Sequence, residues 1–282
     1  MEIIGYIASV FIGISLGLIG GGGSILTVPV LVYLFGESAE LSTAYSLFIV
    51  GTTALVGGIR NATMGNVNYK TAVVFTIPAF IAVYLTRAYL VPAIPQNILT
   101  VGTFTLTKDI AIMVFFALVM LAASVSMIRN KREEEGEEGE TAPVFNVPAI
   151  VAEGAVVGVL TGIVGAGGGF LIIPALVLFA KLPMKKAVGT SLLIIAAKSL
   201  IGFIGDVQRP DLIIDWTLLL TVTAIAVAGI FVGIYATKFI DGKKLKKGFK
   251  TILMNFQSLK NLLKTVITLW KKIFLQSYIK MM

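Results

Sequence analysis

The sequence contains no cysteine and no histidine. Without thiols it can form no disulfide framework and has no thiol redox chemistry, and without imidazole it lacks the commonest metal ligand. The nucleophile–base pairs Ser–His and Cys–His are excluded for the same reason. We therefore expect no catalytic residue, no metal site and no cofactor, and a protein that is not an enzyme.

Charged residues are also scarce. They make up 13% of the 282 residues, whereas hydrophobic residues make up 57%; soluble domains contain about 25% charged and about 45–50% apolar residues. The stretch 110–128 carries no charge, and as a helix it would be about 28 Å long, enough to cross a hydrocarbon core. The composition predicts an all-α integral membrane protein.

The net charge of +8 would suggest nucleic acid as the partner of a soluble protein. Here Lys and Arg stand beside apolar runs, where they set the orientation of membrane spans. The expected partners are therefore the lipid bilayer and a small anion, and not nucleic acid. The sequence leaves a homodimer open.

Hydropathy divides the chain into about 7–9 membrane segments. The charged stretch 129–147 is predicted to be a cytoplasmic linker between a first transmembrane repeat, 1–128, and a second, 148–247. Lysines interspersed with apolar residues at helical spacing predict a basic amphipathic helix over 248–282, with a divergent terminal span as the alternative. The predicted segments are 3–20 with 24–35, 42–59, 71–91, 110–128, 148–165 with 170–180, 187–205 and 213–237.

The two halves resemble each other. When the chain is shifted by 145 residues without a gap, 14 of the 45 positions from Gly13 to Gly57 are identical to those from Gly158 to Gly202. Matches of Leu, Ile and Val are expected by chance in apolar sequences, but matched glycines, a proline and a serine are not. We interpret the pattern as an internal duplication. The identical positions, in the first copy, are Gly13, Gly17, Gly20, Gly22, Gly23, Leu26, Pro29, Leu31, Val32, Ser46, Leu47, Ile49, Leu55 and Gly57.

Basic residues predict opposite orientations for the two copies. The bases of 129–132 and of 238–247 place both boundaries of the second half in the cytoplasm, so 148–180 must be a hairpin that crosses twice. The loop 181–186 is then cytoplasmic, whereas its equivalent 36–41 and the N-terminus are outside. This is an inverted repeat, as in many secondary transporters. Arg87 and Lys108 fall on the outer side and depart from the rule.

Two glycine clusters interrupt apolar runs, one at Gly20, Gly21, Gly22, Gly23 and Ser24 and the other at Gly165, Gly167, Gly168 and Gly169. Consecutive glycines destabilise a helix, and broken backbone at membrane depth must face protein or a water-filled cavity. Helices that restart at Ser24 and Phe170 would point free N–H groups at the breaks, which suits an anion. The alternative is close helix packing, which we favour for Gly13, Gly17, Gly158 and Gly162.

Polar side chains in the following spans are candidate ligands. Ser46 and Ser191 are equivalent in the repeat, and Thr190 precedes the latter; their hydroxyls could donate to an anion or bond to their own helix carbonyls. Lys198 lies in mid-span, where a charge is costly unless paired or hydrated. It could attract the anion, pair with Glu153, or extend to the membrane surface. Glu153 itself could carry a proton or lie at headgroup level.

These motifs resemble a known family. The pattern Gly-x-x-x-Gly-x-x-Gly-x-Gly-Gly followed by an apolar run and proline, from Gly158 to Pro174, and then 187–192 (AVGTSL) are similar to the TauE/SafE sulfite exporter family, and Gly13 to Pro29 repeats the first motif. The resemblance covers roughly 1–245, and 249–282 departs from it. It implies a secondary transporter of sulfite, sulfoacetate or other organosulfonates in the prokaryotic inner membrane. A passive anion channel is the alternative function.

Overall fold

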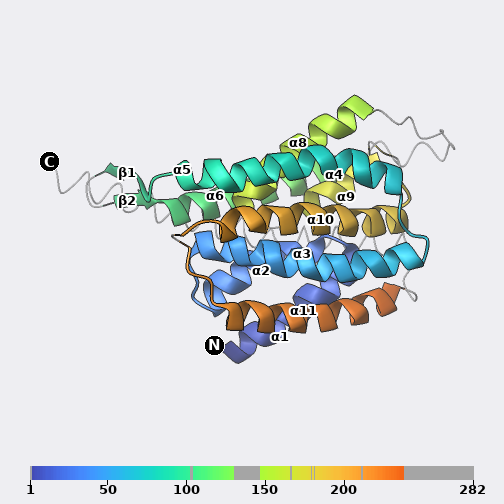
Figure 1. The fold of residues 1–282 in the computed structure, drawn as a ribbon, viewed down its shortest axis with the longest axis horizontal. Helices are drawn as coiled ribbons and strands as arrows, with labels where there is room; N and C mark the ends of the chain where they lie inside the picture. Colours follow the sequence, from blue (N-terminus) through green and yellow to red (C-terminus); the bar gives the residue numbers. More distant parts are fainter. Residues whose placement is uncertain are drawn as a thin grey trace.

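The computed structural model of the chain describes residues 2–101, 104–129, 147–165, 167–178, 180, 182–210 and 212–237. The predicted linker, the segment 248–282 and the bases of 238–247 lie outside these residues. The described part is an elongated bundle of helices (Figure 1). Its helices are α1 (Glu2–Ile19), α2 (Gly22–Leu34), α3 (Ala39–Thr63), α4 (Tyr69–Leu85), η1 (Thr86–Leu90), α5 (Val91–Ala93), α6 (Lys108–Arg129), α8 (Val147–Val164), α9 (Gly169–Leu178), α10 (Met184–Val207) and α11 (Trp216–Ala236).

Helices α3 and α10 form the centre of the bundle and lie side by side (Figure 1). They run antiparallel, because Arg209, two residues after α10, contacts Glu40 at the start of α3, while Asn68 in the loop after α3 contacts Thr190 near the start of α10. In each of them 72% of the most apolar window is buried, compared with 28% for 69–93. The outer pairs are α1 on α11 and α8 on α4.

Close packing of the outer pairs depends on glycine. A Cβ on Gly17 would lie 2.5 Å from the Ile230 carbonyl oxygen, and one on Gly158 would lie 2.5 Å from that of Ala79. Gly13 faces the Ala226 carbonyl in the same way. The packing interpretation of these glycines is confirmed: they allow backbone-to-backbone approach between apolar helices that have no hydrophobic driving force in lipid.

Among the described residues, four helices are long and apolar enough to cross a membrane, namely Ala39–Thr63, Tyr69–Ala93, Met184–Val207 and Trp216–Ala236. The predicted span 71–91 corresponds to α4, η1 and α5 together. The backbone hydrogen bonds of this span change register in the π-helical turn η1, where the Val91 N–H donates to the Thr86 carbonyl, five residues earlier, in place of four. The next residue, Pro92, has no backbone N–H and so donates no hydrogen bond within the helix.

One element departs from the all-α prediction. The strands β1 (Asn97–Val101) and β2 (Phe104–Thr107) form a two-stranded antiparallel sheet between α5 and α6, in which Thr100 pairs with Thr105. Strand β2 alternates Phe104 and Leu106 with threonines, and β1 contains the β-branched residues Ile98, Thr100 and Val101; such residues favour an extended conformation. The sheet lies at one end of the bundle, beyond the apolar helices (Figure 1).

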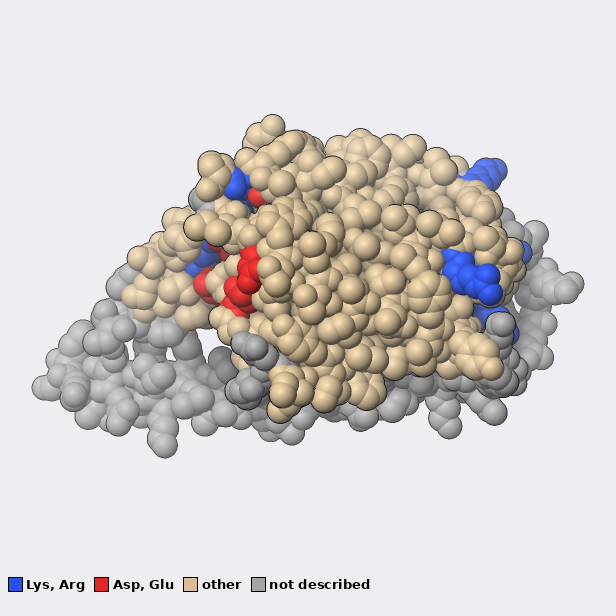
Figure 2. Space-filling view, turned by 60° about the horizontal axis from the view of Figure 1, so that its bottom comes forward, with Lys and Arg blue, Asp and Glu red and all other residues tan. Residues whose placement is uncertain are grey.

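The two ends of the molecule differ in the charged residues that they carry. Figure 2 shows a face on which Lys and Arg occur without acidic neighbours at one end, acidic residues gather at the other, and uncharged atoms cover the band between. At the acidic end Lys108 Nζ and Arg209 Nη1 each lie 2.7 Å from Glu40 Oε1, and Arg87 faces Asp206. Arg87 and Lys108 depart from the orientation rule when each is counted alone. In the structure each contacts a carboxylate, so neither is an isolated positive charge at this end.

Candidate functional site

Both glycine clusters interrupt the helical backbone, as predicted. Helix α1 ends at Ile19 and α2 begins at Gly22, with Gly20 at φ +73°. Helix α8 ends at Val164 and α9 begins at Gly169, and the glycines at 165, 167 and 168 all have φ between +61° and +70°. The predicted restarts at Ser24 and Phe170 are wrong by two residues and one, because glycine itself occupies the first position of each new helix.

The two breaks contact each other inside the bundle. A Cβ on Gly21 would overlap the backbone of Gly169, and a Cβ on Gly169 would overlap that of Gly21. A Cβ on Gly167 would lie 3.3 Å from the Cβ of Ser24. The tips of the α1–α2 and α8–α9 hairpins, which come from different halves of the sequence, therefore meet with no side chain between them.

Each tip also rests on the central helix of the other half. Gly20 packs against α10, where its Cβ would lie 2.9 Å from Ser191 Oγ and from a methyl of Val188. Gly165 packs against Thr43 of α3. The last turn before each break is closed in the same way, by Gly20 N–H to the Leu16 carbonyl at 2.7 Å and by Gly165 N–H to the Thr161 carbonyl at 2.8 Å.

Backbone donors point toward these tips. The first-turn N–H groups of any helix have no acceptor within the helix, and the residue before α2, Gly21, caps none of them with a side chain. In α9 the Gly168 carbonyl accepts from the N–H groups of Leu171 and Ile172. Two helix N-termini thus begin at the meeting point, and each carries a partial positive charge.

The predicted hydroxyls differ in what they bind. Ser24 Oγ donates to the Gly21 carbonyl at 2.6 Å, and Ser191 Oγ donates to the Val188 carbonyl at 2.8 Å, so both are engaged within their own segments. Thr190 Oγ1 accepts from the N–H of Asn68 at 2.9 Å, which places it against the α3–α4 loop. Ser46 is fully buried, and its Oγ has no hydrogen-bond partner among the described residues.

Lys198 lies beside the second tip. Its side chain is fully buried, its Nζ donates to Thr161 Oγ1 at 2.8 Å, and a Cβ on Gly168 would lie 3.1 Å from that nitrogen. The hypothesis of a pair with Glu153 is not what the structure contains, since Thr161 is the hydrogen-bond partner, and burial argues against extension to the membrane surface. When protonated, Lys198 therefore places a positive charge beside the second tip.

Sequence reasoning missed several polar groups near the site. Thr161 was not singled out, although the repeat pairs it with Leu16, so that a polar residue replaces an apolar one. On α3 the hydroxyls of Ser42 and Thr53 are fully buried and, like that of Ser46, have no partner among the described residues. Their spacing of four and eleven residues puts all three on one face of α3.

Comparison with known proteins identifies a family and relatives of the chain. The family model described as Sulfite exporter TauE/SafE matches residues 6–256. The chain belongs to this family. It is 29% identical over 236 residues to a probable membrane transporter protein of Xylella fastidiosa strain 9a5c, covering 83% of this chain and 84% of that one. It is 27% identical over 207 residues to the probable membrane transporter protein MJ0441 of Methanocaldococcus jannaschii, covering 72% and 69%. No solved structure matches the chain.

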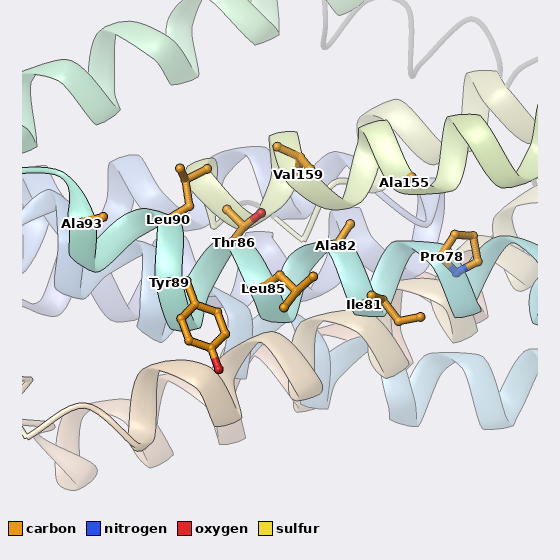
Figure 3. Close-up of a pocket in the computed structure, with 10 residues that line it drawn as sticks. All are labelled: Pro78, Ile81, Ala82, Leu85, Thr86, Tyr89, Leu90, Ala93, Ala155 and Val159. Atoms are coloured by element: carbon orange, nitrogen blue, oxygen red, sulfur yellow. The ribbon is translucent and has the colours of Figure 1, made fainter.

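This TauE/SafE protein is therefore an integral membrane protein of a transporter family. It also has an apolar groove of about 800 Å³ between α4–α5 and α8 (Figure 3). Thr86 and Tyr89 contribute the hydroxyls of its lining, and the other eight residues are apolar: Pro78, Ile81, Ala82, Leu85, Leu90, Ala93, Ala155 and Val159. None of the residues that line the groove belongs to the glycine clusters, so the groove is distinct from the candidate site at the hairpin tips.

Proposed function

We propose that the chain is a secondary transporter of small sulfur-containing oxyanions, such as sulfite, sulfoacetate or other organosulfonates, and that it works by alternating access as a multi-pass protein of the inner (plasma) membrane. The observation that carries the proposal is the contact between the two broken hairpins, where two helix N-termini, Lys198 and buried hydroxyls converge. Membership of the TauE/SafE family supports the class of substrate.

The proposal includes an inverted repeat, in which 1–128 and 148–247 are equivalent halves. Equivalent helix pairs support it, because α1 packs on α11 as α8 packs on α4. The hairpins α1–α2 and α8–α9 open toward opposite ends of the bundle (Figure 1). Two hydrogen bonds also correspond. Tyr45 Oη of α3 accepts from the backbone N–H of Asp215, which caps α11, at 2.5 Å, and its equivalent, Thr190 Oγ1 of α10, accepts from that of Asn68, which caps α4, at 2.9 Å.

The chemistry at the tips suits a weakly held anion. Backbone N–H groups and hydroxyls can each donate to a sulfonate or sulfite oxygen without a full charge, so that binding remains reversible. Lys198 balances one negative charge, which matters because an unpaired charge at membrane depth is costly. Because the tips belong to different halves, a rocking of one half against the other would expose the same donors first to one side and then to the other.

Transport by purified protein in lipid vesicles tests the proposal. Vesicles loaded with unlabelled sulfite should accumulate radiolabelled sulfite against its concentration gradient, since an alternating-access carrier exchanges one anion for another. A passive channel would only equilibrate the label. Absence of both accumulation and equilibration for sulfite, sulfoacetate and taurine would reject the proposed substrate class.

Variants at the tip test the site. Gly167→Leu and Ser191→Leu should each lower kcat/KM more than about tenfold, equivalent to about 1.4 kcal/mol, because both insert bulk where the hairpins meet. Gly36→Leu is a matched control: Gly36 also has positive φ, at +79°, but no atom lies within 4 Å of a Cβ there. Transport by the two tip variants equal to that of the control would remove the site from the hairpin tips.

A further inference from the structure

A buried ion pair joins η1 to the last turn of α10 at the acidic end of the bundle. Arg87 and Asp206 are both fully buried, and Arg87 Nε lies 3.5 Å from Asp206 Oδ2. A Cβ on Gly205 would lie 3.2 Å from the Cβ of Arg87, so α10 and η1 approach closely beside the pair. Neither residue of the pair belongs to the proposed site at the hairpin tips.

The hydrogen bonds of this pair are incomplete. None of the three guanidinium nitrogens of Arg87 and neither carboxylate oxygen of Asp206 has a hydrogen-bond partner within the described part of the chain. The neighbouring Glu40 differs, because its Oε1 lies 2.7 Å from both Lys108 Nζ and Arg209 Nη1. An arginine has five N–H donors arranged to bind an oxyanion in two-point fashion, so Arg87 has donors that Asp206 does not satisfy.

The fold does not require a carboxylate at position 206. The repeat pairs Asp206 with Asn61, which is buried and whose Nδ2 donates to the Gly57 carbonyl of its own helix at 2.9 Å. A neutral amide is therefore compatible with the equivalent place on α3. Arg87 lies in a π-helical turn, and such turns occur frequently at functional sites. Both observations favour a role for the charged pair beyond helix packing.

We propose that Arg87 is a second anion-binding residue, near the acidic end of the transport path, and that Asp206 occupies its guanidinium as an internal carboxylate until the transported anion replaces it. The inference rests on the proposed function and extends it with a second subsite. The ligand is an oxyanion that presents two or more oxygens to one guanidinium, which includes sulfonates.

Exchange of the carboxylate for an anion is linked to a proton. When Asp206 takes up a proton, Arg87 retains its positive charge, and an incoming anion restores neutrality at the pair. The charged groups around Asp206 are Arg87, Arg209, Glu40 and Lys108; the last three contact one another and change little in the exchange. Anion binding at Arg87 should therefore strengthen as the pH falls, and the dependence should disappear when residue 206 cannot ionise.

Methanesulfonate is the appropriate probe, because it is the anion of a strong acid and keeps its single negative charge at every pH at which the protein is folded, so that any pH dependence of binding comes from the protein. The thermal unfolding temperature of the full chain in detergent is measured as methanesulfonate is added, since a ligand that binds the folded state raises it. Asp206→Asn should bind methanesulfonate at least about tenfold more tightly than the unmodified protein, the gain of one charge-assisted hydrogen bond. Its affinity should not depend on pH.

The matched control is Glu37→Gln, which removes a carboxylate from the α2–α3 loop, away from the Arg87–Asp206 pair, and should bind as the unmodified protein does. The double variant Arg87→Gln with Asp206→Asn should lose the gain. A gain that persists in the double variant, or that Glu37→Gln shares, would overturn the proposal. If Asp206→Asn folds only when methanesulfonate is present, that rescue supports the proposal; failure to fold at any concentration, while the double variant folds, overturns it.

The experiment separates this inference from the proposed site at the hairpin tips. Gly167→Leu combined with Asp206→Asn should retain tight methanesulfonate binding at Arg87 even though kcat/KM for transport is lowered. If methanesulfonate never stabilises Asp206→Asn but Gly167→Leu still abolishes transport, the subsite fails and the proposed function stands. If methanesulfonate stabilises Asp206→Asn but Gly167→Leu leaves transport unchanged, Arg87 binds the anion and the tips are not the transport site.

Discussion

Replacing Gly167 by alanine measures how tightly the two hairpin tips are packed. Gly167 has φ +61°, and a Cβ there would lie 2.5 Å from Val50 Cγ1 and 3.3 Å from Ser24 Cβ. A residue with a Cβ is destabilised by about 1–2 kcal/mol in the left-handed conformation. Overpacking of a closed interior adds about 1–3 kcal/mol. The expected loss in the free energy of unfolding is therefore about 2–5 kcal/mol.

Gly36→Ala separates the two contributions. Gly36 has φ +79° with open space around a Cβ, so it should lose only the conformational part, about 1–2 kcal/mol. A second substitution, Val50→Ala in the Gly167→Ala background, removes the methyl that the new Cβ meets. The double-mutant cycle should then give a favourable coupling of about 1–3 kcal/mol.

The assay is reversible unfolding in mixed detergent micelles, with increasing denaturing detergent and tryptophan fluorescence as the signal. The comparison depends on differences between variants, which are more reliable than absolute stabilities. Equal losses for Gly167→Ala and Gly36→Ala would refute close packing at the tips. A larger loss for Gly167→Ala that Val50→Ala does not relieve would refute the contact with α3 as its cause.

Three further predictions concern the ends of the bundle. Tyr45→Phe and Thr190→Val should each lower the free energy of unfolding by about 1–3 kcal/mol, because each leaves a helix-capping N–H without its acceptor; unchanged stability in the same assay would reject these bonds. Glu40→Gln should lower it by about 3–5 kcal/mol, because two basic side chains lose a carboxylate. Burial and the neighbouring Asp215 carboxylate raise the pKa of Glu37, so ionised Glu37 opposes folding above that pKa. Glu37→Gln should therefore be no less stable than the unmodified protein near neutral pH, and any gain should vanish as the pH falls and Glu37 is protonated.

Much of the backbone could be predicted from apolar runs and glycine positions. The duplication aligned Gly20 with Gly165, and both have φ near +70° at the end of a first hairpin helix. Such features are local, because a glycine cluster inside an apolar run breaks a helix whatever surrounds it. The exact restart of each helix was not predictable, since glycine permits both the break and the first helical turn.

The polar contacts could not be predicted in the same way. Lys108 and Glu40 are 68 residues apart and belong to different helices, and a single sequence carries no information that pairs them. Lys198 was recognised as an intramembrane charge, yet its partner, Thr161, became identifiable only when α8 and α10 were placed together. The β1–β2 sheet was missed because its two short strands lie between the predicted spans 71–91 and 110–128, in a stretch that hydropathy identifies only as a connection.

The two halves share a backbone plan but not a charge distribution. At two buried positions of the central helices, α3 has Thr53 and Asn61 where α10 has Lys198 and Asp206. A duplication with identical halves would make the two end states of a rocking motion equal in energy, because each half would adopt the environment of the other. Charges carried by α10 alone remove that equality, since desolvating an ion depends strongly on whether it is buried or hydrated. In the proposed alternating-access cycle, the energy difference between the two states therefore depends on the charge of Lys198 and of the Arg87–Asp206 pair, which a transported anion and a proton would both change.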